Sequence, residues 1–308
     1  MTVDAPLSRT WLPAWPCPVG AILGVHRRGA GDPTYLVLPD GSHARALRTP
    51  VGTASLAVIA VPAAGEVAAR AWGAGAEWVL DRLPRMLGAD DAPAGFEPPE
   101  PLAAHWRRHQ HWRLGSTDLV MESLVPTIIE QKVTGQEAFA GFRRLVRRFG
   151  EPAPGPLDLW VQPAAATVRM IPSWEWLRLP VDGGRSRPLV AAARVADSLE
   201  RAGAATYDEF DRRVRSIPGI GGWTSAEVRS RALGDADAVS FGDYHVAKDV
   251  GWALVGEPVD DDGLAELLEP DRPHRHRIPH LVAAARIAPP RRGARMAPRG
   301  HLPGRAHR

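Results

Sequence analysis

Residues 214–254 read VRSIPGIGGWTSAEVRSRALGDADAVSFGDYHVAKDVGWAL, and this stretch decides the fold. Its centre, Ile217-Pro218-Gly219-Ile220-Gly221, joins two helical patterns by a tight apolar hairpin, in which glycine permits positive φ and close backbone approach. Backbone N–H groups at the start of the second helix, aided by the helix dipole, suit an anion such as a phosphate. An ordinary helix turn with a glycine cap explains the same letters equally well.

The sequence before the hairpin predicts further helices. Thr117 and Asp118 are candidate N-caps of one helix, and Pro126 is expected to begin the next. The arginines at 143–148 lie on a helix that Gly150 ends. Further helical patterns cover 187–202, 206–216 and 224–232. Helix after helix with short turns indicates an all-helical domain over 101–293.

The N-terminal part has a different pattern. Residues 18–62 alternate short apolar runs with turn residues, which predicts a small sheet, and helical spacing begins at Gly65 and continues to Leu87. The segment 88–101, GADDAPAGFEPPEP, has the composition of a linker or domain crossing. We therefore expect an α+β protein with an accessory domain over 1–100, the helical domain over 101–293, and a basic, disordered tail over 294–308.

Composition narrows the class of protein. At 308 residues, with 44% hydrophobic and 24% charged residues, the chain is long enough for about two globular domains. The net charge is +3, and residues 271–308 contain ten arginines and one aspartate, which favours an anionic partner. Cys17 is the only cysteine, which excludes intramolecular disulfides and four-cysteine iron–sulfur clusters. We expect no secretory signal and no membrane span, and a cytoplasmic location.

The hairpin and its surroundings resemble the helix-hairpin-helix DNA glycosylases. In that family a hydrophobic-Pro-Gly-hydrophobic-Gly hairpin is followed by a catalytic aspartate, here Asp243 in Phe241-Gly242-Asp243-Tyr244. The match is closest to the branch of DNA-3-methyladenine glycosylase II, and LVPTIIEQKV at 124–133 is similar to the helical segment before the hairpin. The PPRRG run at 289–293 resembles tails of actinobacterial-type members. The resemblance spans about 115–293 and implies activity on double-stranded DNA with alkylated bases, as a monomer.

The resemblance also implies a reaction type. Members that cleave the DNA backbone carry a lysine nucleophile where this chain has Trp223, so we expect a monofunctional glycosylase that uses water and has no AP lyase activity. Breaking a C1′–N bond develops positive charge on the sugar, and Asp243 is expected to stabilise that charge and orient the water. A helix N-cap is the alternative role for Asp243, and Asp237 and Asp249 are the competing carboxylates. Trp223 and Tyr244 are expected to line the base pocket, where an aromatic wall attracts a cationic base.

DNA contacts are carried over in the same way. The residues expected to contact DNA are Gly219, Ile220, Gly221, Thr224, Gln131 and Lys132. The backbone carbonyls of Arg215, Ile217 and Ile220 are expected to hold a monovalent cation, Na⁺ or K⁺, and no cofactor is expected for catalysis.

Two departures from the family leave questions open. Lys132 stands where the family inserts an apolar wedge into the DNA stack, and Glu227 and approximately Ala283 stand where relatives have pocket aromatics. Trp174 and Trp176 are candidate substitutes, although packing residues are the more common interpretation. Two alternative functions remain: a module that binds damaged or bent DNA without cleaving it, and a glycosylase with lyase activity through an unassigned amine.

Overall fold

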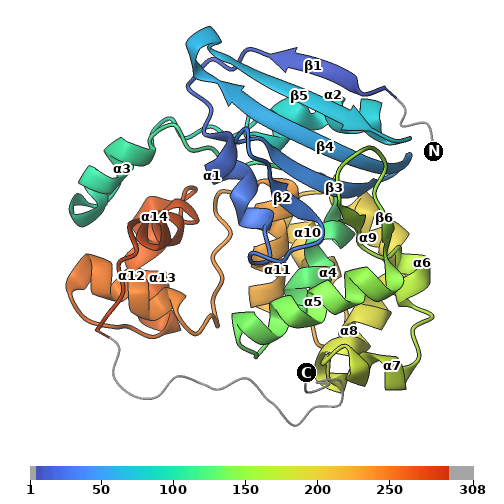
Figure 1. Cartoon of the computed structure of the whole chain (residues 1–308). Coiled ribbons are helices and arrows are strands. Elements are labelled where there is room, and N and C mark those ends of the chain that lie inside the picture. The colour runs from blue at the N-terminus through green and yellow to red at the C-terminus, as the bar shows by residue number, and fades with distance from the viewer. Residues whose placement is uncertain (1–4, 291–308) are drawn as a thin grey trace.

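A computed structural model describes residues 5–290, and its N-terminal part is a five-stranded antiparallel sheet (Figure 1). The strands lie in the order β1-β5-β4-β3-β2, so that β5, β4 and β3 are each paired on both sides. Helix α2 packs its buried side chains on one face of the sheet. The elements are β1 (Leu7–Trp11), α1 (Val19–Leu23), η1 (Gly24–His26), β2 (Tyr35–Val37), β3 (His43–Thr49), β4 (Gly52–Val61), η2 (Pro62–Ala64), β5 (Glu66–Trp72) and α2 (Ala76–Met86).

The expectation of helix from Gly65 onward is wrong for its first part. Residues Glu66–Trp72 form strand β5, and helix begins only at Ala76. Val67 and Ala71 have the spacing of a helical face, but Val67, Ala69 and Ala71 are buried together, and this period of two is that of a strand.

The central body of the molecule is helical. Its core is formed by side chains of α4, α5 and α8–α11. A two-stranded ribbon, β6 with β7, interrupts the helices and lies against β3, an addition to the all-helical part that we expected. The elements are α4 (Val120–Glu130), α5 (Gly135–Phe149), β6 (Glu151–Pro152), β7 (Trp160–Val161), α6 (Ala165–Val168), α7 (Ser173–Arg178), α8 (Gly183–Arg194), α9 (Ala196–Ala202), α10 (Tyr207–Arg215), α11 (Gly222–Val228) and the π-helical turn η4 (Arg229–Leu233).

Two expected helix starts are wrong. Pro126 lies inside α4, which passes through it. Thr117 and Asp118 do not cap α4; the Glu200 carboxylate accepts hydrogen bonds from the amides of Val120 (2.9 Å) and Met121 (2.8 Å) instead. The cap therefore comes from α9, which is distant in sequence, and local spacing gives no sign of it.

A third group of helices forms a separate apolar cluster, beside the body in Figure 1. It contains η3 (Glu100–Leu102), α3 (Ala103–His109), α12 (Val246–Val255), α13 (Asp261–Leu268), η5 (Glu269–Asp271) and α14 (Arg277–Ala285). The 88–101 segment crosses to this cluster, where Phe96 is buried and Asp91 forms a buried ion pair with Arg277 at 2.5 Å.

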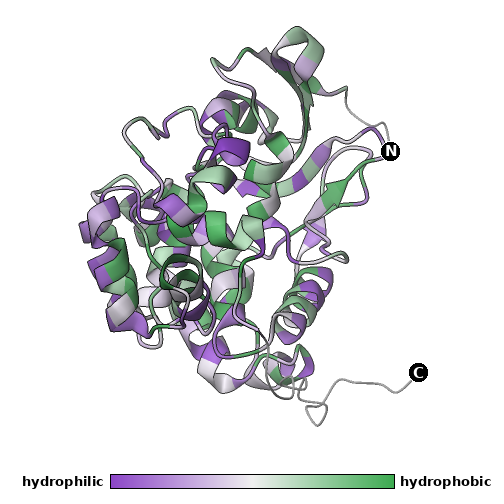
Figure 2. Cartoon of the chain, turned by 90° about the vertical axis from the view of Figure 1, so that its left-hand side faces the viewer, coloured by the Kyte–Doolittle hydropathy of each residue, from purple (hydrophilic) through white to green (hydrophobic). Residues whose placement is uncertain are grey.

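The expected mixed fold is confirmed: a small antiparallel sheet is combined with many helices. Figure 2 shows the helices as ribbons of mixed hydrophilic and hydrophobic segments, as expected for amphipathic helices on a core. None of the helices in residues 5–290 is long and apolar enough to cross a bilayer. The tail at 294–308, and residues 291–293 of the PPRRG run, lie outside the described residues.

Candidate active site

The hairpin joins α10 to α11 and is anchored by its apolar residues. Ile217 and Ile220 are buried in the central core, whereas Pro218 and Gly219 between them are exposed. Gly219 has φ of +90°, and a Cβ there would lie 2.6 Å from Cγ of Pro188. Both the backbone conformation and the available space therefore require glycine at this position.

The backbone beyond the turn is open to solvent. The N–H of Ser225 donates to the Gly221 carbonyl at 3.1 Å and begins the hydrogen bonding of α11. The amides at 222–224 consequently lie at the free N-terminal end of the helix, where an anion is favoured. Gly221 and Gly222 are exposed, and a Cβ on either meets no atom within 4 Å. A ligand backbone has room to approach this end of α11.

Gln131, expected to contact DNA, also connects two helices. It caps the C-terminus of α4, and its Nε2 donates to the Gly219 carbonyl (3.1 Å) and to Oγ1 of Thr224 (2.8 Å). The Thr224 side chain is thereby buried, while Lys132 beside Gln131 is exposed with φ of +53°. The structure thus brings Gln131, Gly219 and Thr224 together, and Lys132 follows Gln131 at the same end of α4.

Asp243 lies in the loop before α12 and is held by three hydrogen bonds. Oδ1 accepts from the amides of His245 (2.7 Å) and Val246 (3.2 Å), and Oδ2 accepts from Nε1 of Trp223 (3.1 Å). The carboxylate therefore caps the start of α12 and is also tied to the first turn of α11. The contact with the Trp223 indole was not anticipated from sequence, which assigned that ring to a pocket wall.

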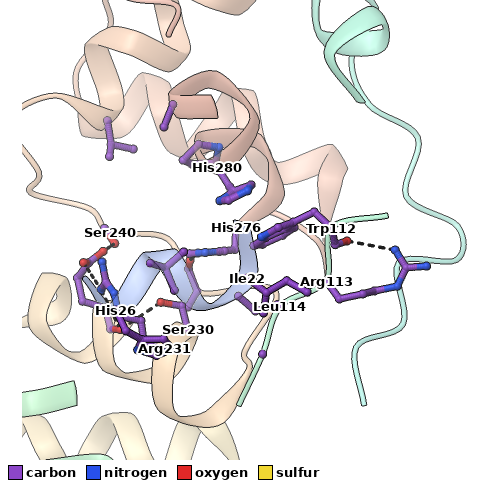
Figure 3. Close-up of a pocket in the computed structure, with 17 residues that line it drawn as sticks. Ile22, His26, Trp112, Arg113, Leu114, Ser230, Arg231, Ser240, His276 and His280 are labelled. Atoms are coloured by element: carbon purple, nitrogen blue, oxygen red, sulfur yellow. Dashed lines mark hydrogen bonds and ion pairs between the residues drawn. The ribbon is translucent and has the colours of Figure 1, made fainter. Parts of the chain in front are cut away.

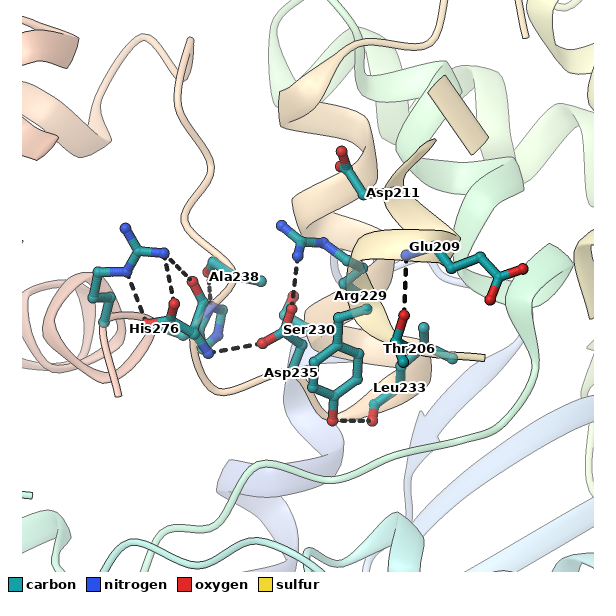
Figure 4. Close-up of polar contacts among 12 residues, drawn as sticks. Thr206, Glu209, Asp211, Arg229, Ser230, Leu233, Asp235, Ala238 and His276 are labelled. Atoms are coloured by element: carbon teal, nitrogen blue, oxygen red, sulfur yellow. Dashed lines mark hydrogen bonds and ion pairs between the residues drawn. The ribbon is translucent and has the colours of Figure 1, made fainter. Parts of the chain in front are cut away.

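The competing carboxylate Asp237 is engaged elsewhere. It accepts hydrogen bonds from Arg272 (3.0 Å) and from Arg275, which lies 2.6 Å from Oδ2. The same loop is held by an ion pair between Arg229 and Asp235 (2.9 Å), one of the contacts drawn in Figure 4. Asp237 is therefore part of a structural ion-pair network, and this lowers its rank as a catalytic group.

The other aromatic candidates lie apart from Asp243 or face solvent. Tyr244 is 74% exposed, with Nζ of Lys248 3.7 Å from its ring centroid. Trp176 is buried in α7 and donates from Nε1 to the Ile171 carbonyl (3.2 Å), and Trp174 on the same helix is exposed. Contact of Trp223 or Tyr244 with a base stays a prediction.

A cavity of about 210 Å³ (Figure 3) lies close to the loop of Asp243, but Asp243, Trp223 and Tyr244 are not among the residues that line it. Ser240, whose carbonyl accepts the N–H of Asp243, and Val246 both line it. Its walls come from four parts of the chain: α1 with η1, the segment 112–115, α11 with η4, and the region from 238 to α14. The lining residues are Ile22, Val25, His26, Trp112, Arg113, Leu114, Gly115, Glu227, Ser230, Arg231, Ala238, Ser240, Val246, His276, Pro279, His280 and Ala283.

Glu227 and Ala283, the two positions where relatives have pocket aromatics, both line this cavity. The Glu227 carboxylate is paired with Arg231 and accepts a hydrogen bond from the Ser240 hydroxyl. Burial raises the pKa of Glu227, but the positive charge of Arg231 and the Ser240 hydrogen bond outweigh burial, and the net pKa is lowered. Glu227 is therefore ionised at neutral pH.

The three histidines of the cavity were missed as site residues. Burial lowers the pKa of His26 and His276, and lowers the pKa of His280 to about 3. His280 stacks on Trp112 with ring centroids 3.6 Å apart, and Nδ1 of His276 is 2.9 Å from the Ala238 carbonyl (Figure 4). All three rings are neutral at pH 7; the clustering of histidines at 274–280 is a sequence signal for His276 and His280, and nothing in the sequence indicates His26.

Comparison with solved structures identifies the fold. The 3-methyladenine DNA glycosylase from Archaeoglobus fulgidus matches with a TM-score of 0.75 at 18% identity, over 90% of this chain and 98% of that chain. The 8-oxoguanine glycosylase/lyase of Clostridium acetobutylicum, in complex with double-stranded DNA, matches with a TM-score of 0.68 at 11% identity, over 93% and 99%. The chain has the fold of these DNA glycosylases. No protein-family model and no curated protein sequence matches it.

Proposed function

We propose that the protein is a DNA glycosylase that hydrolyses the N-glycosidic bond of alkylated purines in base excision repair. The observation that carries the proposal is the position of Asp243, which is bonded to Trp223 at the hairpin end of α11 and also to Ser240 and Val246, two residues that line a cavity of about 210 Å³. The fold shared with the two solved DNA glycosylases supports it.

The carboxylate of Asp243 acts on the sugar and on water. As the C1′–N bond breaks, the base leaves with the bonding electron pair and positive charge develops on the sugar, which the fixed carboxylate stabilises. Water then adds its oxygen to C1′ and gives up a proton, for which Asp243 is the acceptor. The bonds from Trp223, His245 and Val246 hold the carboxylate in one orientation before DNA binds. A 3- or 7-alkylated purine already carries positive charge and leaves without strong acid assistance.

The hairpin supplies the hold on double-stranded DNA. In this proposal the amides of Gly219, Gly221 and Thr224 contact phosphates, and Ile220, Gln131 and Lys132 also contact the DNA. The carbonyls of Arg215, Ile217 and Ile220 offer the oxygen donors that a monovalent cation requires. This donor set fits because Arg215 ends α10, where carbonyls lack helical partners, and Ile217 uses its oxygen for a single bond, from Ile220 at 3.0 Å.

We further propose that the enzyme has no AP lyase activity and acts as a monomer. Trp223 cannot form a Schiff base, and the chain has two lysines, Lys132 and Lys248. The amine of Lys248 lies over the Tyr244 ring, so it is engaged with an aromatic face. Borohydride trapping of a covalent adduct with DNA tests this point, and a trapped adduct contradicts it.

Release of 3-methyladenine and 7-methylguanine from methylated duplex DNA tests the function. The wild type is expected to release alkylated bases, and Asp243→Asn is expected to reduce release about 100-fold or more. Asp262→Asn, at an exposed position of α13, is the matched control and should retain activity. A wild type that binds duplex DNA but releases no base from any lesion would establish the alternative, a non-catalytic DNA-binding module.

A further inference from the structure

The cavity close to the loop of Asp243 has a charged pair on its wall, formed by Glu227 and Arg231. Glu227 follows Trp223 by one turn of α11, and Arg231 follows Glu227 by one turn in η4. Their side chains are 15% and 21% exposed, although both residues line the cavity, so the pair is neither fully buried nor free in solvent. The Ser240 hydroxyl donates a hydrogen bond to Oε1 of Glu227, and this bond helps to fix the position of the carboxylate.

A second ion pair lies close to the first. Arg28 of the N-terminal part contacts Glu130 of α4 at 2.8 Å, and the charge of Glu130 also acts on Arg231. Arg231 is thus attracted by both Glu227 and Glu130, which fixes its guanidinium at the cavity wall.

The pair keeps hydrogen-bonding capacity. Oε1 of Glu227 accepts from Ser240 and Oε2 accepts from Arg231, and each carboxylate oxygen has a second lone pair. In residues 5–290, the hydrogen bonds of Arg231 leave from Nη1 alone, to the carboxylate and the main-chain carbonyl of Glu227. The pair therefore offers a guanidinium donor next to two carboxylate acceptors.

This pattern is the complement of one nucleobase edge. Guanine presents, in order, the O6 acceptor, the N1–H donor and the N2 amino donor, whereas adenine presents an amino donor followed by the N1 acceptor. A carboxylate oxygen placed opposite adenine N1 would bring two hydrogen-bond acceptors together, and they repel each other. We propose that Arg231 and Glu227 read the Watson–Crick edge of the extruded base, and that the enzyme prefers alkylated guanine to alkylated adenine. This inference rests on the proposed glycosylase function.

The remaining ionisable groups of the cavity add no charge toward the base. Burial keeps the pKa values of His26, His276 and His280 low, so their rings are neutral. Arg113 points away from the cavity in Figure 3 and donates to the carbonyls of Gln110 and Trp112. The charge pattern that faces the base is therefore that of the Glu227–Arg231 pair.

Duplex DNA treated with dimethyl sulfate tests the inference, because it contains 7-methylguanine and 3-methyladenine in the same substrate. Released bases are separated by chromatography, and each rate is divided by the amount of that lesion. We expect wild type to favour 7-methylguanine, and Glu227→Gln to lower the ratio of 7-methylguanine to 3-methyladenine release about tenfold, the scale of one bidentate contact. Glu77→Gln, at an exposed site on α2, is the control and should keep the wild-type ratio.

A second measurement needs no variant. Free 7-methylguanine should inhibit the wild type at least about tenfold more strongly than free 7-methylhypoxanthine, which lacks only the 2-amino group. Equal inhibition by the two bases, or an unchanged release ratio in folded Glu227→Gln, overturns the recognition role. A wild type that releases neither base overturns the proposed function instead, so the two failures are distinguishable.

Discussion

The two ends of α11 use different chemistry. At its N-terminal end, the hairpin presents backbone amides beside exposed glycines, and the side chains near them serve to hold the turn. Toward its C-terminal end, the cavity presents a carboxylate, a guanidinium and neutral imidazoles on side chains. The first end suits the uniform phosphate backbone of DNA, and the second suits a base that differs from its neighbours. The difference suggests that DNA affinity and base selection can be altered separately.

The largest expected effect is a loss of stability at low pH, which comes from the cavity end of α11 and not from the hairpin end. Because burial holds the pKa of His280 at about 3 and that of His26 well below 6.5, the unfolded chain binds more protons than the folded one below pH 6.5. Stability should therefore fall as the pH drops from 7.5 to 5.5, and His280 alone should contribute about 1.4 kcal/mol to this loss. Urea titrations at both values measure it.

A matched variant assigns this effect to the cavity. His280→Gln cannot titrate, and should reduce the loss on acidification by about 1.4 kcal/mol. The same loss in wild type and variant would place the titrating groups elsewhere. Phosphate binding by amides has no titrating group in this range, so the affinity for undamaged duplex should stay nearly constant.

The next effect is expected from a substitution that disrupts the hairpin. Gly219→Ala forces a side chain onto a backbone with φ of +90° and against Pro188, at a cost of about 1–3 kcal/mol. We expect affinity for undamaged duplex DNA to fall roughly tenfold in an anisotropy titration, with inhibition by free base unchanged. Gly221→Ala, where an added Cβ meets no atom, is the matched control and should show a smaller loss. Equal losses in both variants would mean that the turn conformation is not what binds DNA.

An effect of similar size is expected at Asp243, which is bonded to the first turn of α11. Trp223→Phe keeps an aromatic ring but removes the indole N–H that donates to Oδ2. A hydrogen bond to a charged group contributes about 1.5–3 kcal/mol, and the two main-chain bonds to Oδ1 remain, so we expect kcat for base release to fall about tenfold with little change in DNA affinity. Unchanged kcat would show that the main-chain bonds alone orient the carboxylate.

The smallest expected effect is a loss of stability that changes neither the hairpin nor the cavity. Glu200→Gln weakens the cap of α4 by replacing a carboxylate with an amide, and we expect a loss of about 1 kcal/mol in the free energy of unfolding. The ratio of released bases should remain that of wild type. A changed ratio would show that the position of α4 influences the cavity through Glu130.

The hairpin region was predictable because its determinants are local. Pro218, Gly219 and the apolar residues around them specify the turn within a few positions, and Asp243 follows on the same stretch. The strand β5 was misread because its alanines lie at spacings that fit a helix as well as a strand, and pairing with β4 decided between them.

The cavity was not predictable to the same degree. His26, Trp112 and His280 come together from three distant segments, and none of them has a neighbour in sequence that reveals the contact. The Glu200 cap has the same cause, because its partners lie on another helix. The family resemblance did identify Glu227 as a pocket position, but the contacts of Glu227 with Arg231 and Ser240 depend on the fold.

The shortness of α11 has a consequence for how this molecule can change. A helix rises 1.5 Å per residue and turns by about 100°, so the chain between Gly222 and Glu227 fixes both the separation and the relative direction of the phosphate contact and the base contact. One inserted residue would turn Glu227 out of the cavity while leaving the hairpin intact. New base preferences in chains of this kind are therefore expected to arise by exchange of side chains on α11 and η4, while the number of residues between the two contacts stays constant.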